Sequence, residues 1–169
     1  MYQYIFSELQ KNKMVFENLL KSTSKDAYHW KKAPDKWCLL EIICHLYDEE
    51  REDFRVRLGL VLETPEVKPP PFNPEKWVIE RKYMEQDFNE KLEGFLEERD
   101  KSIEWLQSLE NPKWNNAYQH PKYGPFSAKF YLTNWLAHDC LHIRQITRLK
   151  YDYLQHISGE SVRYAGEWK

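Results

Sequence analysis

Several residue patterns are rare in this sequence, and each absence excludes a class of protein. Glycine occurs only 5 times in 169 residues, and turn-dense stretches are few, which argues against an all-β sandwich or barrel. The 3 cysteines form no Cys-x-x-Cys pair, so neither a disulfide framework nor a cysteine-based metal site is expected. No apolar run approaches the ~18 residues that a membrane-spanning helix requires, so we predict no membrane segment.

The charge pattern restricts the partners and the compartment. The net charge is −2, and acidic and basic residues are intermixed without a basic stripe, so nucleic acid is not an expected partner. Residues 1–8 lack the basic region and the long apolar segment of a secretory signal. We therefore expect a cytoplasmic protein. Its thiols should be reduced and should serve as small buried residues; they are Cys38, Cys44 and Cys140.

Aromatic residues, in contrast, are abundant. They make up 15% of the chain, with 7 Trp and 11 Tyr, and hydrophobic residues make up 41%. This content favours a packed globular fold over a disordered one. A chain of this length can bury one hydrophobic core, and neither half has enough apolar residues for a core of its own. We therefore predict one domain over residues 1–169.

Hydrophobic periodicity predicts four long helices. The connections at 62–73 and 111–125 contain several prolines and cannot be regular helix. The predicted fold class is therefore all-α, a four-helix bundle with long crossover connections. The helices are expected near residues 4–21, 37–61, 74–109 and 127–154, the last with Ser127 as its N-cap.

Each predicted helix carries an inward stripe, with residues three or four positions apart. The residues from His156 onward should dock on the bundle through Tyr164 and Trp168. The stripes of the last three helices are Cys38, Ile42, His45, Glu49, Glu52 and Val56; Phe88, Leu92, Phe95, Arg99, Ile103 and Leu106; and Tyr131, Trp135, His138, His142, Gln145 and Leu149.

Three histidines on two of these stripes suggest a metal site. His138 and His142 are four residues apart, so their imidazoles share one helix face. His45 adds a third nitrogen from another helix, although histidine pairs at this spacing also arise by chance. Three protein ligands and one open position are typical of catalytic zinc, and imidazole also suits nickel, copper and iron. The sequence thus predicts one divalent metal ion on these histidines.

Glu49 lies one turn after His45, and its role is open between several alternatives. It could ligate the metal, accept a hydrogen bond from a ligand imidazole, or act as a general base through metal-bound water. It could also be a solvated carboxylate at the mouth of the bundle. We favour the supporting or base role and assign Glu49 as the candidate catalytic residue.

Other polar residues near the histidines have competing interpretations. Asp139 makes His138–His142 similar to the His-Glu-x-x-His zinc motif, but an exposed helix face explains it equally well. Gln145 and Arg99 could bind substrate, although a core amide and an arginine that reaches out to solvent are the simpler interpretations. His120, before a proline, is expected to be structural or to lie at a pocket rim. His29 and His156 belong to no cluster.

Several segments resemble the DinB/YfiT-like superfamily. They are Pro34–Trp37 leading to Ile42–Leu46, then His120–Pro125, His138–Ile146 and the tail Tyr164–Trp168. The resemblance implies a four-helix bundle that often dimerises, with His45, His138 and His142 at the positions of the family's metal triad. Better-understood branches of the family are similar to thiol-dependent transferases and to metal-dependent hydrolases.

The sequence therefore leads to two main functional hypotheses. The first is a metalloenzyme, with zinc or nickel as the metal, that acts on a small molecule. It would be either a hydrolase that uses metal-bound water or a transferase that uses a low-molecular-weight thiol. The second is a non-catalytic, metal-stabilised or ligand-binding module with a stress-related role. A di-iron carboxylate bundle is disfavoured because no Glu-x-x-His pair occurs in the chain.

Overall fold

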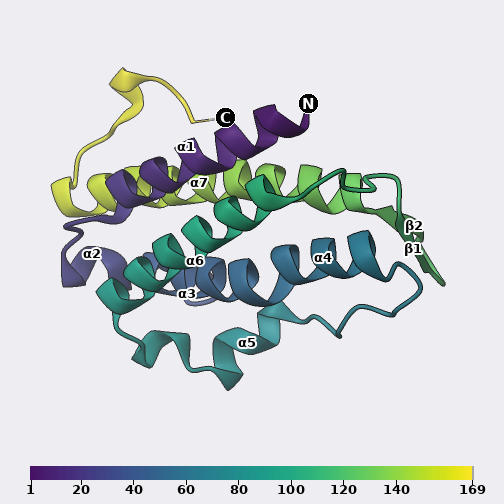
Figure 1. The fold of residues 1–169 in the computed structure, drawn as a ribbon. Coiled ribbons are helices and arrows are strands. Elements are labelled where there is room, and N and C mark those ends of the chain that lie inside the picture. The colour runs from purple at the N-terminus through teal and green to yellow at the C-terminus, as the bar shows by residue number, and fades with distance from the viewer. Residues whose placement is uncertain (169) are drawn as a thin grey trace.

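The bundle helices lie where the sequence predicts four helical segments. The structure is a computed structural model that describes residues 1–168, and its longest helices run side by side (Figure 1). α1 packs against α6 and α7, α3 packs against α6, and α4 packs against α7. The predicted all-α four-helix bundle is confirmed. Its helices are α1 (Tyr2–Leu20), α3 (Leu39–Glu49) continuing into α4 (Arg55–Glu63), α6 (Phe88–Ser108) and α7 (Ala128–Ser158).

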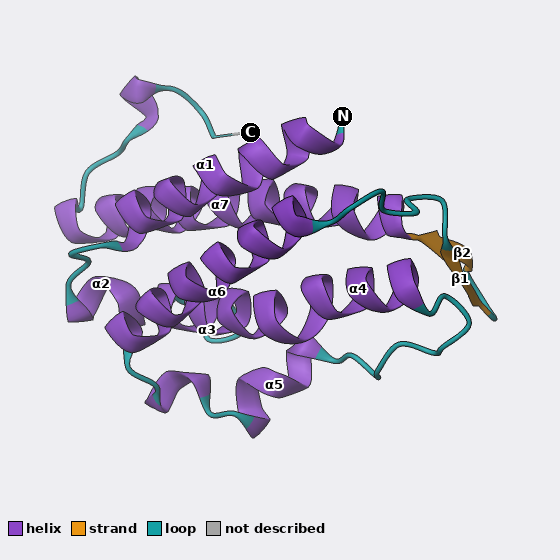
Figure 2. Cartoon of the chain, viewed as in Figure 1, coloured by secondary structure: helices purple, strands orange, loops and turns teal. Residues whose placement is uncertain are grey.

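Short elements occupy the connections. A short helix, α2 (Lys25–His29), follows α1, and its N-cap Ser24 accepts a hydrogen bond from the backbone N–H of Ala27. The second long connection holds an antiparallel hairpin, which lies beyond the end of α4 at one end of the bundle (Figure 2). The predicted N-cap Ser127 follows this hairpin and accepts from the N–H of Phe130. The remaining short elements are α5 (Pro74–Glu80), β1 (Ala117–His120), β2 (Gly124–Ser127) and 3₁₀ turns at Tyr83–Glu85 and Arg163–Ala165.

The prediction of one uninterrupted helix from Pro74 to Leu109 is wrong. Pro74 does begin a helix, but α5 ends at Glu80, and Lys82 adopts a left-handed backbone conformation with φ of 49°. A new helix begins after Asp87, whose side chain accepts from the N–H of Glu90. The α5 segment instead folds against α3, because Arg81 binds both Asp48 and Glu52.

The helix predicted over 37–61 is interrupted by a π-helical turn at Glu50–Phe54. A π turn inserts an extra residue, which shifts the inward face of every later residue. The predicted stripe therefore holds through Glu49 and then fails: Glu52 and Val56 are only partly buried, whereas Asp53 and Leu58 are buried.

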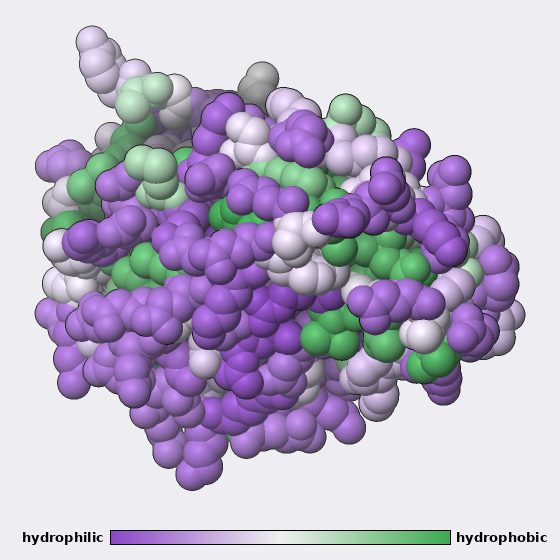
Figure 3. Space-filling view, viewed as in Figure 1, coloured by the Kyte–Doolittle hydropathy of each residue, from purple (hydrophilic) through white to green (hydrophobic). Residues whose placement is uncertain are grey.

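The core otherwise follows the predicted stripes, apart from Gln145 on α7, which is exposed. All six stripe residues of α6 are buried, from Phe88 to Leu106. Gly94 permits close packing there, because a Cβ at this position would lie 2.9 Å from the ring of Tyr47. Hydrophilic residues dominate the face of the molecule drawn in Figure 3, with hydrophobic residues in smaller areas between them. No helix within residues 1–168 is both long enough and apolar enough to cross a membrane.

Two surface expectations need correction. Cys38 and Cys44 are buried as expected, but Cys140 is exposed, because it lies on the outer face of α7. The C-terminal segment docks through Trp168, whose ring lies 5.4 Å from that of Tyr151. Tyr164, in contrast, is fully exposed and adds nothing to this contact.

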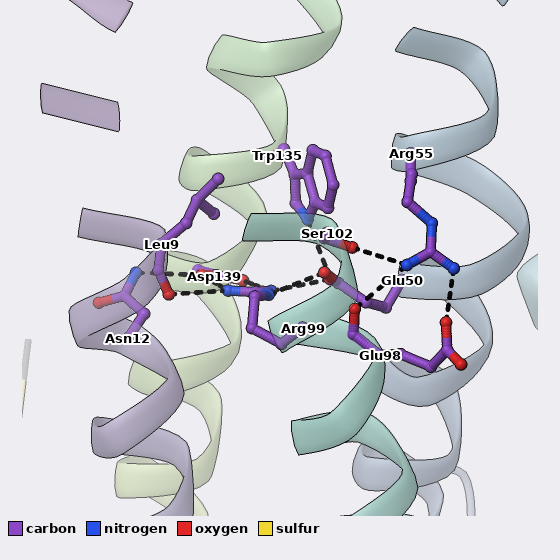
Figure 4. A network of polar contacts seen from close by, with 9 residues as sticks. All are labelled: Leu9, Asn12, Glu50, Arg55, Glu98, Arg99, Ser102, Trp135 and Asp139. Atoms are coloured by element: carbon purple, nitrogen blue, oxygen red, sulfur yellow. Dashed lines mark hydrogen bonds and ion pairs between the residues drawn. The ribbon is translucent and has the colours of Figure 1, made fainter. Parts of the chain in front are cut away.

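A buried ion network crosses the centre of the bundle (Figure 4). The Arg99 guanidinium donates to both carboxylate oxygens of Glu50, at 2.9 Å each, and to both of Asp139, at 2.7 and 2.8 Å. It also donates to the carbonyl of Leu9 in α1, and the Trp135 indole N–H donates to Glu50. Arg99 therefore does not extend to solvent, and Asp139 is not on an exposed face: both are almost completely buried.

Removal of this guanidinium should destabilise the bundle strongly. Arg99→Met would leave Glu50 and Asp139 buried without their counter-charge, which we expect to lower the free energy of unfolding by about 3–5 kcal/mol. Urea denaturation of metal-stripped protein, followed by circular dichroism, measures this loss. The control is Lys21→Met, because Lys21 pairs with Glu17 in an exposed position at the end of α1 and should contribute only about 0–1 kcal/mol. Similar losses in the two variants would contradict the central role of the network.

Candidate metal centre

The three predicted histidines meet between α3 and α7. The Nε2 atom of His138 lies 3.2 Å from Nε2 of His45 and 3.0 Å from Nε2 of His142. One ring nitrogen from each histidine fits within a cluster no wider than 4.8 Å. The structure thus brings together side chains that are 93 residues apart in sequence, with their Nε2 atoms facing one another.

Helix geometry and neighbouring aromatic rings set the positions of these imidazoles. α3 begins after Cys38, whose backbone N–H donates to Glu41 at 2.9 Å, so His45 lies near the middle of a well-capped helix. The ring of Trp37 lies 5.0 Å from that of His45, and the ring of Phe54 lies 5.0 Å from that of His138. The aromatic rings on either side restrict rotation of the imidazoles. The sequence did not identify Trp37 or Phe54 as part of the site. Trp37 is, however, the last residue of Pro34–Trp37, one of the segments on which the family resemblance rests.

The cluster lies at the edge of the core. His45 and His142 are buried, whereas His138 is partly exposed. Burial lowers the pKa of His45 to about 3. The pKa values of His138 and His142 are also lowered, first by burial; the neighbouring histidines lower that of His138 further, and the Gln145 side chain partly opposes the shift on His142. All three rings are therefore kept neutral, which is the form that binds metals.

Hydrogen bonding alone leaves this arrangement unsatisfied. A neutral imidazole nitrogen carries either a proton or a lone pair, so the two Nε2 contacts of His138 must share one proton or one lone pair, or one contact is left unpaired. The Nδ1 atoms of His45 and His142 are buried and have no hydrogen-bond partner among the described residues. A divalent ion would use the three Nε2 lone pairs together. Nitrogens bound tetrahedrally to zinc at 2.0–2.1 Å lie roughly 3.3 Å apart, close to the two separations found here.

Glu49 lies behind His45, on the side of its Nδ1 atom. Its Oε1 is 3.5 Å from that Nδ1, and its carboxyl is almost completely buried. The alternative of a solvated carboxylate at the mouth of the bundle is therefore wrong. Burial, followed by the nearby charge of Asp53, raises the pKa of Glu49 to about 9. This position suits a partner for the Nδ1–H of His45 better than a direct metal ligand.

The remaining candidates lie outside the cluster. Asp139 points into the Arg99 network, so the similarity to the zinc-protease motif does not extend to its acidic position. Gln145 is exposed and does not belong to the inward stripe. His120 has the structural role expected of it: its Nδ1 accepts the backbone N–H groups of Lys122 and Tyr123 at 3.1 Å, and it lines a pocket beside the hairpin. The remaining two histidines lie away from the site. His29 contacts the carbonyl of Lys25 within α2, and the ring of His156 packs against Trp30.

Comparisons with known proteins agree with this fold. A family model described as the DinB superfamily matches residues 8–146. The structure is similar to that of YfiT from Bacillus subtilis, described as a probable metal-dependent hydrolase with an unusual four-helix bundle topology. The TM-score is 0.78 at 16% sequence identity, over 95% of this chain and 89% of that one. A comparison with curated protein sequences finds no match.

Buried neutral histidines make a testable contribution to stability. His45 has a pKa of about 3 in the folded protein but about 6.5 when unfolded. Between these values the unfolded chain binds a proton that the folded chain does not, so stability falls as the pH falls. We expect metal-stripped protein to lose roughly 1 kcal/mol per pH unit from this histidine below about pH 6.

Urea midpoints at pH 7 and pH 4.5 measure this dependence. His45→Gln should lose less stability than the wild type over the same interval, because it lacks the group that must take up a proton on unfolding. His29→Gln is the matched control and should behave as the wild type does. If all three proteins lost the same amount, a buried neutral His45 would be ruled out.

Proposed function

The chain belongs to the DinB superfamily, and on that basis we propose that it is a divalent-metal-dependent hydrolase that acts on small molecules. The observation that carries the proposal is the convergence of three neutral imidazoles on one point, with Nε2 separations of 3.0 and 3.2 Å. His45, His138 and His142 would hold the ion, with zinc or nickel as the candidates. A bound divalent ion would supply Lewis acidity and lower the pKa of a coordinated water.

The protein's own residues prepare this site. Burial keeps the three rings unprotonated, so they do not repel a cation. The partial exposure of His138 places the cluster at the edge of the core, the side from which a substrate would approach. The proton on Nδ1 of His45 would point at Glu49 Oε1, which would fix the orientation of the ring.

Glu49 is thus proposed first as a positioning residue for His45. Its sequence-based assignment as a catalytic base stays a prediction, because the carboxyl lies on the Nδ1 side of the ring, away from the Nε2 atoms. Thiol transfer, a non-catalytic role, a homodimer and a cytoplasmic location also stay predictions.

The histidine assignment is tested by metal content. His45→Ala, His138→Ala and His142→Ala should each lose most of the bound metal, because each removes one of three ligands. Elemental analysis of protein purified without a chelator or a histidine tag measures the stoichiometry. His29→Ala and His156→Ala, outside the cluster, should match the wild type. Equal metal loss in both sets would exclude this triad.

Metal-loaded protein should hydrolyse at least one member of a panel of p-nitrophenyl esters, with the activity lost on metal removal and restored on reloading. If metal-loaded protein released p-nitrophenol no faster than metal-stripped protein across the panel, the result would argue against hydrolysis.

Substitution of Glu49 separates positioning from proton transfer. Glu49→Gln should weaken metal binding by roughly 10–100-fold, the usual effect of losing a partner behind a ligand histidine. A chelator competition measures this affinity. Glu52→Gln, in the next turn but bound to Arg81, is the matched control.

Activity in excess metal decides between the two roles. If Glu49 positions His45, saturation with metal should restore the turnover of Glu49→Gln. If Glu49 is the base, turnover stays lower by about 10²–10⁴-fold even when the site is full.

A further inference from the structure

A large pocket adjoins the histidine cluster. It has a volume of about 570 Å³ and lies between the loop that follows α2 and the C-terminal half of α7. Trp37 and Gln145 are on its wall. The same Trp37 ring packs against His45, 5.0 Å between ring centres, and Gln145 lies three residues after His142, on the same side of α7. The pocket and the histidines therefore share a wall, and a pocket of this size holds a small molecule.

Cationic side chains dominate the polar lining. Lys32 and Lys36 enter the pocket from the loop, and Arg144 and Arg148 enter it from successive turns of α7. Among residues 1–168, the only carboxylate in the lining is Asp152. Lys32 donates to it at 2.9 Å and Arg148 at 3.1 Å. Asp152 therefore holds these two cationic side chains in place, and they neutralise its negative charge.

Two cations remain available to a ligand. Lys36 pairs with its neighbour Asp35, but both side chains are well exposed, so this pair is weak. No hydrogen bond or ion pair with a residue of the described chain, 1–168, engages the Arg144 guanidinium. A guanidinium matches the two oxygens of a carboxylate or phosphate and binds them side by side.

Apolar surface faces these charges. Trp37, Leu141, Leu149 and Trp168 also line the pocket. The Trp168 ring lies against Arg148, 5.5 Å from its guanidinium carbon. The pocket therefore offers a positive group for one end of a ligand and aromatic surface for its body.

We propose that this pocket binds a small organic anion, with its carboxylate or phosphate group on Arg144 and Lys36 and its apolar body against Trp37. Its position beside His45 and His142 makes such an anion the substrate class of the hydrolase. That last step rests on the proposed function, whereas anion binding does not.

The test uses metal-stripped protein, because a carboxylate would otherwise bind a metal directly. Isothermal titration calorimetry compares 2-naphthoate and naphthalene-2-phosphonate with the neutral 2-naphthamide. At least one anion should bind the wild type roughly tenfold more tightly than the amide, and added salt should reduce the difference. The stronger of the two anions identifies the carboxylate or the phosphate as the natural group.

Variants locate the binding. Arg144→Gln should weaken anion binding roughly tenfold and leave binding of the amide unchanged; Lys36→Gln should have the same effect to a smaller degree. Lys129→Gln removes a charge from the exposed side of the first turn of α7, outside the pocket, and should change nothing. Both anions binding no better than the amide, or equal effects of Arg144→Gln and Lys129→Gln, would overturn the proposal.

Metal analysis of the same proteins separates this proposal from the previous one. Arg144→Gln should retain wild-type metal content. If the protein binds the anion but no metal, the proposed anion pocket stands and the proposed metal-dependent hydrolase is excluded. If it binds metal but not the anion, the hydrolase proposal stands and the anion pocket is excluded.

Discussion

One buried guanidinium connects the four helices of this bundle. Arg99 of α6 bonds to Glu50 at the end of α3, to Asp139 of α7 and to the Leu9 carbonyl of α1. Buried ion pairs contribute little net stability compared with apolar packing, but each carboxylate becomes costly when its partner is absent. The network therefore penalises any helix register other than the one in which all its members meet.

The position of this network matters for the histidine cluster. Glu50 directly follows Glu49, and Asp139 directly follows His138. Successive residues of a helix point about 100° apart, so α3 and α7 each present one side chain to the site and the next to the network. A shift of either helix that separated the imidazoles would also break a charge-assisted hydrogen bond to Arg99. The convergence of three neutral rings, which is unfavourable by itself, is thus supported by contacts that the adjacent residues of the same helices make.

The sequence predicted the bundle and the identity of the histidines, because both depend on helical spacing. The six α6 stripe residues and the Ser127 cap were correct for this reason. The π turn at Glu50–Phe54 could not be predicted, since its sequence is compatible with an ordinary helix and its extra residue is stabilised by tertiary contacts. The break at Lys82 was missed although Asp87 is a good N-cap before Glu90, a signal that was available. Arg99 was misjudged because periodicity shows that a residue faces inward but not which charges it will meet there.

The role of Glu49 could not be predicted for the same reason: periodicity gives the direction of a side chain but not its partners. Spacing placed it one turn from His45 on the inward stripe, which is equally consistent with a ligand, a supporting group or a base. Only the three-dimensional position separates these roles: the carboxyl faces Nδ1 of His45, whereas the other two imidazoles face Nε2. Since a ring cannot present both nitrogens to the same ion, this position supports the proposal that Glu49 positions the ring of His45 and is not itself a ligand. The π turn begins at the next residue, so the backbone leaves the regular helical path directly after it has placed both side chains. The irregular turn thus rotates the rest of the segment to bury Asp53 and Leu58 without altering the spacing of His45 and Glu49.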